Sequence, residues 1–206
     1  MDFSPGHLDL LLSRLFHDLI SPIGAARNGL ELLKEFGADD VGADAMDLAA
    51  HSTEQATDRL TFFRMAFGGA GSSAGHGFAE ADRIARGYLA SRRIEWAISG
   101  ASGAPTPQTG TVKVLLGTVA VIADCLPRLG RVSASVGDGS VTVSGHGEGA
   151  SLEGEIVRML DGSAEARDER TVLAATVCAN ARRFGVKLAV DAVSPPTVSI
   201  GFGESS

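Results

Sequence analysis

The sequence predicts an α+β protein in which an N-terminal hairpin of two antiparallel helices precedes a sandwich with helices on one face of a sheet. Two observations lead to this fold class. Residues 68–77 read GGAGSSAGHG, with five glycines and no large apolar side chain, so they form a linker or a long turn. The chain before this segment has two helix-length stretches, whereas the chain after it alternates between helices and antiparallel strand pairs. We therefore expect a helical domain at 1–68, a linker at 69–77 and a larger domain at 78–206.

The first helix is expected to run from Pro5 to about residue 36. Pro5 suits the first helical position, and Gly37 favours termination. A second helix is expected from residue 39 or 40 to about residue 67, and the short connection makes the two helices antiparallel neighbours. Both helices carry more apolar surface than one contact can hide. This excess predicts a homodimer in which two hairpins form a four-helix bundle.

The larger domain mixes helical and strand patterns. Strands are indicated by alternating apolar and polar residues, and the turns by Gly137-Asp138-Gly139 and Ser194-Pro195-Pro196. Gly185 favours the end of a helix. The expected elements are a helix at 78–91, a strand at 93–99, a buried helix at 111–127 ended by Pro127, a hairpin at 131–145, helices at 152–161 and 170–184, and a second hairpin at 186–202.

The composition excludes several classes of function. The formal net charge is −7, with 25 acidic against 18 basic residues, which argues against a nucleic-acid partner because phosphate binding needs a basic surface. Two distant cysteines, Cys125 and Cys178, form no disulfide framework and fit a reducing cytoplasm. No apolar run reaches the roughly 20 residues of a membrane helix. His51 has no acid or cysteine at a spacing that makes a convincing set of metal ligands, and we expect no metal site in the chain.

His17 is expected to lie on the polar face of the first helix. Successive residues turn by about 100° around the helix axis. The side opposite His17 carries a stripe that we expect to form the core, namely Leu8, Leu12, Leu15, Leu19, Ala26, Leu30 and Leu33. The face of His17 itself carries small and polar residues, namely Ser13, Arg14, Ser21, Gly24 and Asn28, with Leu10 as the clear apolar exception. His17 should therefore point into solvent.

Three neighbours favour a functional role for this histidine. Asp18 can orient or polarise the imidazole. Ser21 and Gly24 leave room for a partner to approach. Pro22 lacks the amide that would bond the Asp18 carbonyl, so we expect a kink at a cost of about 3 kcal/mol. The alternative is a histidine that is merely solvated beside a tolerated kink.

These residues resemble a known family. Residues 17–22, HDLISP, resemble the H-box of sensor histidine kinases, H-[ED]-L-x-x-P. The longer stretch 14–33, RLFHDLISPIGAARNGLELL, is similar to the first helix of the ChpT family of histidine phosphotransferases. Residues 60–68, LTFFRMAFG, resemble the L-x-F-[FY]-R-x-A-F-G ending of that family's second helix. The order of hairpin, linker and α+β domain also fits the family.

The resemblance implies a relay protein that dimerises through its helical bundle. Its second domain would resemble the kinase ATPase, a GHKL (Bergerat) α/β sandwich, in a degenerate form that has lost nucleotide binding. His17 would take a phosphoryl group from the receiver domain of a hybrid kinase, CckA-like, and pass it to response regulators, CtrA-like and CpdR-like. An exposed neutral imidazole suits this nucleophilic role. The chain itself would bind no cofactor, because Mg²⁺ is supplied in the partner receiver domain.

The relay hypothesis divides the site between chemistry and docking. Asp18 would tune the imidazole of His17. Part of the second helix and seven residues around the histidine would form the docking surface for receivers, namely Ser13, Arg14, Ile20, Ser21, Pro22, Gly24 and Arg27.

Two rival functions follow from other interpretations of the larger domain. An ATP-dependent histidine kinase needs an asparagine-bearing N-box helix, but residues 111–127 contain no asparagine and read LGTVA at 116–120, where the N-box would lie. Asp138-Gly139 resembles part of a D-x-G-x-G loop, yet a hairpin turn explains it. We therefore expect no use of ATP. The second rival is a non-catalytic module that docks on two-component proteins and never carries phosphate.

Overall fold

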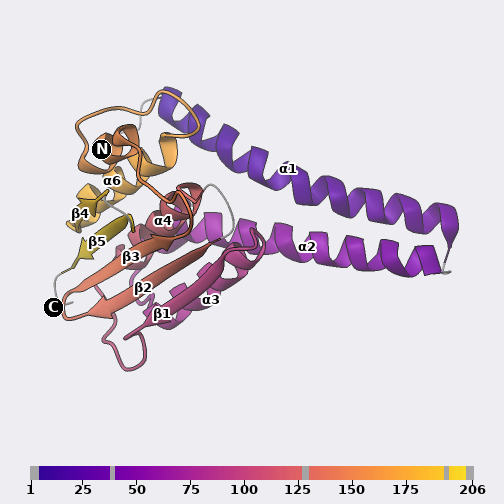
Figure 1. The fold of residues 1–206 in the computed structure, drawn as a ribbon, viewed down its shortest axis with the longest axis horizontal. Coiled ribbons are helices and arrows are strands. Elements are labelled where there is room, and N and C mark those ends of the chain that lie inside the picture. The colour runs from indigo at the N-terminus through magenta and orange to yellow at the C-terminus, as the bar shows by residue number, and fades with distance from the viewer. Residues whose placement is uncertain (1–4, 38–39, 127–129, 193–194, 203–206) are drawn as a thin grey trace.

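The computed structural model describes residues 5–37, 40–126, 130–192 and 195–202, and it has the expected mixed α+β architecture (Figure 1). Pro127 and Ser194, which we expected to end a helix and to open a turn, lie outside these residues. Within the described ranges, no helix is both long enough and apolar enough to cross a membrane.

The N-terminal part is the predicted helical hairpin. Helix α1 spans Pro5–Phe36 and helix α2 spans Asp40–Ala66, and the two run side by side away from the sheet (Figure 1). The helices approach closely at Gly29, where a Cβ atom would lie 2.7 Å from the carbonyl oxygen of Ala45. Small residues at this crossing therefore set the spacing of the hairpin.

The apolar stripe opposite His17 is not fully buried within one chain, contrary to its expected role as a core. Leu8, Leu12 and Leu30 are all exposed. The reason is geometric, because α2 covers only one side of α1. Among the described residues, the large apolar side chains that stay exposed all belong to the hairpin, and they are Leu8, Leu12, Phe16, Ile20, Ile23, Leu30, Leu32, Phe36, Val41, Met46, Leu48 and Leu60.

The glycine-rich segment between the two parts is a compact turn. It contains a short 3₁₀ helix, η1 (Ala70–Ser72), and its Gly71 is buried so closely that a Cβ atom would lie 2.1 Å from the carbonyl oxygen of Met65. His76 hydrogen-bonds both the Ala70 carbonyl at 3.0 Å and the Glu80 carboxylate at 2.7 Å. Of the two forms expected, the long turn is therefore the one observed.

The larger domain places helices on one face of a five-stranded sheet (Figure 1). The strand order is β1-β2-β3-β5-β4, with β1 parallel to β2 and the other neighbours antiparallel. Alternate residues of β2, β3 and β5 are buried under the helices, as expected for a sheet covered on one side. The elements are α3 (Phe78–Ala90), β1 (Glu95–Ser99), α4 (Thr111–Asp124), β2 (Arg131–Gly137), β3 (Ser140–His146), α5 (Gly154–Asp161), α6 (Val172–Phe184), β4 (Lys187–Asp191) and β5 (Thr197–Gly201).

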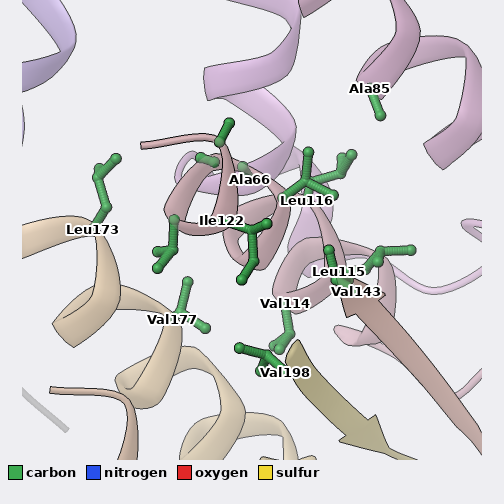
Figure 2. Close-up of a cluster of buried hydrophobic side chains, with 14 of the residues drawn as sticks. Ala66, Ala85, Val114, Leu115, Leu116, Ile122, Val143, Leu173, Val177 and Val198 are labelled. Carbon is green, nitrogen blue, oxygen red and sulfur yellow. The ribbon is translucent and has the colours of Figure 1, made fainter. Parts of the chain in front are cut away.

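The core joins the hairpin to the larger domain. Helix α4 is buried along its length, from Thr111 to Ala123. Figure 2 shows its side chains among those of α6, the strands and the end of α2. Phe62 of α2 also stacks on Tyr88 of α3, with ring centroids 3.8 Å apart. The end of the hairpin next to the larger domain is therefore fixed by apolar packing.

Candidate functional site

His17 projects from α1 into solvent, as the helix geometry predicted. Its side chain is 81% exposed, and its Nδ1 atom lies 3.7 Å from Oδ1 of Asp18. A carboxylate beside Nδ1 favours the tautomer that carries its proton there. That tautomer leaves Nε2 with a free lone pair directed away from Asp18, so Nε2 is the atom able to act as a nucleophile.

Arg14 binds the other carboxylate oxygen of Asp18, Oδ2. Nε of Arg14 lies 3.3 Å from Oδ2 of Asp18, and Nη2 of the same guanidinium donates to Oδ2 of Asp124 at 2.9 Å. Asp124 ends α4, and its second oxygen pairs with Arg92 at 2.8 Å. A row of alternating charges therefore connects the larger domain to the histidine. Asp124 lies at the surface, with 24% of its side chain exposed, and it still pairs with both arginines.

Pro22 leaves a carbonyl without its helical partner, and the structure supplies another. Helix α1 continues through Pro22, which is buried. The missing amide is that of residue 22, so the Asp18 carbonyl lacks its usual donor. Nη1 of Arg59, from α2, donates to this oxygen at 2.5 Å. Arg59 is a site residue that the sequence reasoning missed, since its placement depends on how α2 lies along α1.

The seven predicted docking residues divide into two groups. Ile20, Ser21 and Arg27 are exposed on the helix that carries His17, Gly24 is half-buried there, and Arg27 pairs with Glu31 on the same helix at 3.2 Å. The others contact the protein itself, since Pro22 is buried, Arg14 pairs with two carboxylates and the Ser13 hydroxyl donates to Glu169 of the larger domain.

Ile20 belongs to an apolar surface that the sequence reasoning described only in part. Its side chain is 69% exposed, and Phe16 and Ile23 beside it are exposed as well. Their positions on the helix connect the polar face of His17 to the stripe of exposed leucines. His17 therefore stands at the border between a small polar surface and an apolar one.

A cavity of about 340 Å³ lies under this part of α1. Residues of α1, α4 and α6 line it, with Arg14, Arg92 and Arg170 as its cations and Asp124 and Glu153 as its acids. The cations are already paired, since Glu153 binds Arg170 at 2.8 Å while Asp124 binds the other two. Among residues 5–37, 40–126, 130–192 and 195–202, no histidine, cysteine or acidic cluster could hold a metal ion.

Residues 116–120, where a kinase would carry its N-box, are all buried inside α4. Leu116, Val119 and Ala120 belong to the buried core, and none of the five residues is among those that line the cavity. Cys125 does line it, and burial raises the pKa of its thiol to about 12. This thiol therefore stays protonated at neutral pH and is a poor nucleophile.

Comparisons with known proteins identify the family. Residues 78–195 match the family described as the histidine phosphotransferase C-terminal domain. The chain is also 41% identical over 125 residues to the protein phosphotransferase ChpT of Brucella abortus (strain 2308). The chain belongs to the ChpT-type histidine phosphotransferase family.

The alignments of this ChpT-type chain with two relatives differ in extent. The alignment with the Brucella protein covers 60% of this chain and 57% of that protein's length. A bacterial phosphotransferase whose structure is known at 1.7 Å covers 97% of this chain and 98% of its own, at 30% identity and a TM-score of 0.79. The hairpin and the larger domain of this ChpT-type chain therefore occur together, in a similar arrangement, in a solved phosphotransferase.

Proposed function

We propose that the chain is the histidine relay of a phosphorelay, in which His17 carries the phosphoryl group between aspartates of receiver domains. The observation that carries this proposal is the exposed imidazole of His17 beside the Asp18 carboxylate, on the helix whose sequence resembles that of the ChpT family. The donor would be the receiver domain of a hybrid histidine kinase, CckA-like. The acceptors would be response regulators, CtrA-like and CpdR-like.

The chemistry needs no cofactor from this chain. Nε2 of His17 attacks the phosphorus of a receiver's aspartyl phosphate, a nitrogen–phosphorus bond forms, and the aspartate carboxylate leaves. Mg²⁺ held in the receiver domain neutralises the charge of the phosphoryl oxygens. The reverse step onto a second receiver releases the histidine.

The surface around His17 suits a protein partner. Ile20, Ser21 and Arg27 are exposed on the same helix, and the half-buried Gly24 has no heavy atom within 4 Å of an added Cβ position. Small side chains let a receiver bring its aspartate near the imidazole. Arg27 offers a positive charge for an acidic receiver face.

The exposed apolar stripe supports a homodimer. Leu8, Leu12, Ile23 and Leu30 are exposed along one side of α1, and Met46 and Leu48 are exposed on α2. An apolar surface of this extent on a single chain marks an interaction site. Two hairpins that pair through it would form a four-helix bundle.

Labelled phosphoryl transfer tests the relay directly. A receiver domain carrying ³²P-aspartyl phosphate is mixed with the wild-type chain and with His17→Ala. We expect label on the wild type and none on the variant, and equal labelling of both would overturn the proposal. A kinase, the first rival, would label itself from ATP and Mg²⁺, which the burial of residues 116–120 argues against. A docking module, the second rival, would bind the receiver but accept no label.

A further inference from the structure

Asp18 is held on two sides by arginines that both reach the larger domain. Arg14 binds its side chain and then Asp124 at the end of α4. Arg59 binds its main-chain carbonyl and also donates to the hydroxyl of Ser91, directly after α3, at 3.3 Å. The residue next to the histidine is thus connected twice to a domain that carries no part of the phosphoryl chemistry.

The connection through Asp124 continues into the core of the larger domain. Its Oδ1 pairs with Arg92 at 2.8 Å, and Arg92 in turn donates to the hydroxyl of Tyr88 at 2.9 Å. Tyr88 is buried and stacked on Phe62, so its position is fixed by the core. Charges in such a row are only partly screened by solvent, since the side chains of Arg14 and Arg92 are 20% and 24% exposed.

The carboxylates of Asp18 and Asp124 both bind the guanidinium of Arg14, through different nitrogens. Arg14 contacts Asp18 through Nε at 3.3 Å, while its Nη2 is taken by Asp124 at 2.9 Å. Without Asp124, the same guanidinium could bind both oxygens of Asp18 in a bidentate pair. Because Asp124 occupies one end of it, Oδ1 of Asp18 stays free to face the imidazole of His17.

We propose that Asp124 is a positioning residue for phosphoryl transfer at His17, acting through Arg14 to keep one oxygen of Asp18 directed at Nδ1. This inference rests on the proposed function of His17. When Nε2 forms its bond to phosphorus and the leaving group departs with its electron pair, the ring keeps the Nδ1 proton and becomes positively charged. The free oxygen of Asp18 stabilises that charge where it develops. The larger domain thereby contributes to the reaction although Asp124 does not contact the reacting atoms.

A double-mutant cycle with a small phosphodonor tests this coupling. Phosphoramidate transfers its phosphoryl group to a histidine nitrogen and releases ammonia, so no receiver is needed. We expect Asp124→Asn to slow the labelling of His17 about tenfold, which corresponds to about 1.4 kcal/mol of lost transition-state stabilisation. In an Asp18→Asn background the same change should slow labelling less than twofold. An equal slowing in both backgrounds, or none in the wild type, would contradict the proposal.

The matched control is Glu153→Gln, which removes a carboxylate from the same cavity that pairs with Arg170 and not with α1. It should label at the wild-type rate. If Asp124→Asn lowers the melting temperature by more than a few degrees, Asp124→Glu is used in its place. Asp124→Glu keeps the negative charge but shifts the carboxylate away from Arg14, so we expect the same slowing of labelling.

A second readout follows the imidazole itself. Long-range ¹H–¹⁵N spectra at a pH where His17 is neutral distinguish its two tautomers. Asp124→Asn should lower the fraction that carries its proton on Nδ1, whereas an unchanged fraction would count against the proposal. Labelling of His17→Ala as fast as the wild type would instead overturn the proposed function. Normal labelling of Asp124→Asn together with an unlabelled His17→Ala would overturn the positioning role alone.

Discussion

The guanidinium of Arg59 donates a 2.5 Å hydrogen bond to the main-chain oxygen of Asp18, the carbonyl that loses its helical partner because residue 22 is proline. A proline inside a helix usually produces a kink because this carbonyl is left open. Here a side chain of the neighbouring helix takes the place of the missing amide. The helix therefore continues, and the residue beside His17 gains a fixed main chain.

This bond predicts a coupling between Arg59 and Pro22. Arg59→Met should lower the free energy of unfolding by about 1.5–3 kcal/mol, the range for hydrogen bonds to a charged group. Pro22→Ala returns an amide donor to the helix, so in that background the loss caused by Arg59→Met should be smaller by about 1 kcal/mol. Urea denaturation of the four proteins measures the cycle. Equal losses in both backgrounds would show that the two residues act independently.

The apolar stripe predicts the oligomeric state. Ile23→Lys places a charge in the middle of the exposed stripe of α1, where a partner chain would have to desolvate it. We expect its dimer dissociation constant, measured by sedimentation equilibrium, to rise at least about 100-fold. The control is Asn28→Lys, which adds the same charge at an exposed position on the polar side of the helix. A wild-type chain that sediments as a monomer at every concentration would refute the proposed bundle.

The sequence predicted those features that depend on local geometry. The period of a helix is enough to place His17 opposite the leucine stripe, and alternation is enough to find the strands. The partners of Asp18 were not predictable in this way. Arg59 is 41 residues away in sequence and Asp124 is 110 residues from Arg14, so both contacts depend on how the helices lie against one another. Without that register, the pairing of Asp124 with Arg14 could not be predicted, and the exposed half of the stripe was expected to be core.

Lys113 predicts an unusual dependence of stability on pH. Its side chain is buried and donates to the Gly68 carbonyl, and burial, aided by the nearby charge of Arg183, lowers its pKa from 10.5 to about 8. Between these two values the unfolded chain binds more protons than the folded chain, so this group makes stability rise with pH. Below about pH 8 the lysine is charged in both states, and the contribution is constant.

The measurement compares Lys113→Met with the wild type by urea denaturation at pH values around 7.5 and 9.5. The difference in unfolding free energy between the two proteins should shift in favour of the wild type as pH rises, by at most about 1.4 kcal/mol per pH unit for a single proton. Lys187→Met, at an exposed lysine of β4, is the control and should show no such shift. Parallel curves for both variants would mean that the buried lysine keeps its ordinary pKa.

Two glycines of α1 should respond in opposite ways to the same substitution. Alanine is more favourable than glycine inside a helix by about 1 kcal/mol. A Cβ atom at Gly24 meets no heavy atom within 4 Å, so Gly24→Ala should raise the free energy of unfolding by about 0.5–1 kcal/mol.

A Cβ atom at Gly29 would lie 2.7 Å from the Ala45 carbonyl oxygen and 2.9 Å from the Ala49 nitrogen, so Gly29→Ala must push the two helices apart. Crowding of this kind costs about 1–3 kcal/mol, which outweighs the gain in helix propensity. Thermal and urea unfolding of the two variants checks both signs, and a stabilised Gly29→Ala protein would mean that α1 and α2 lie farther apart than described.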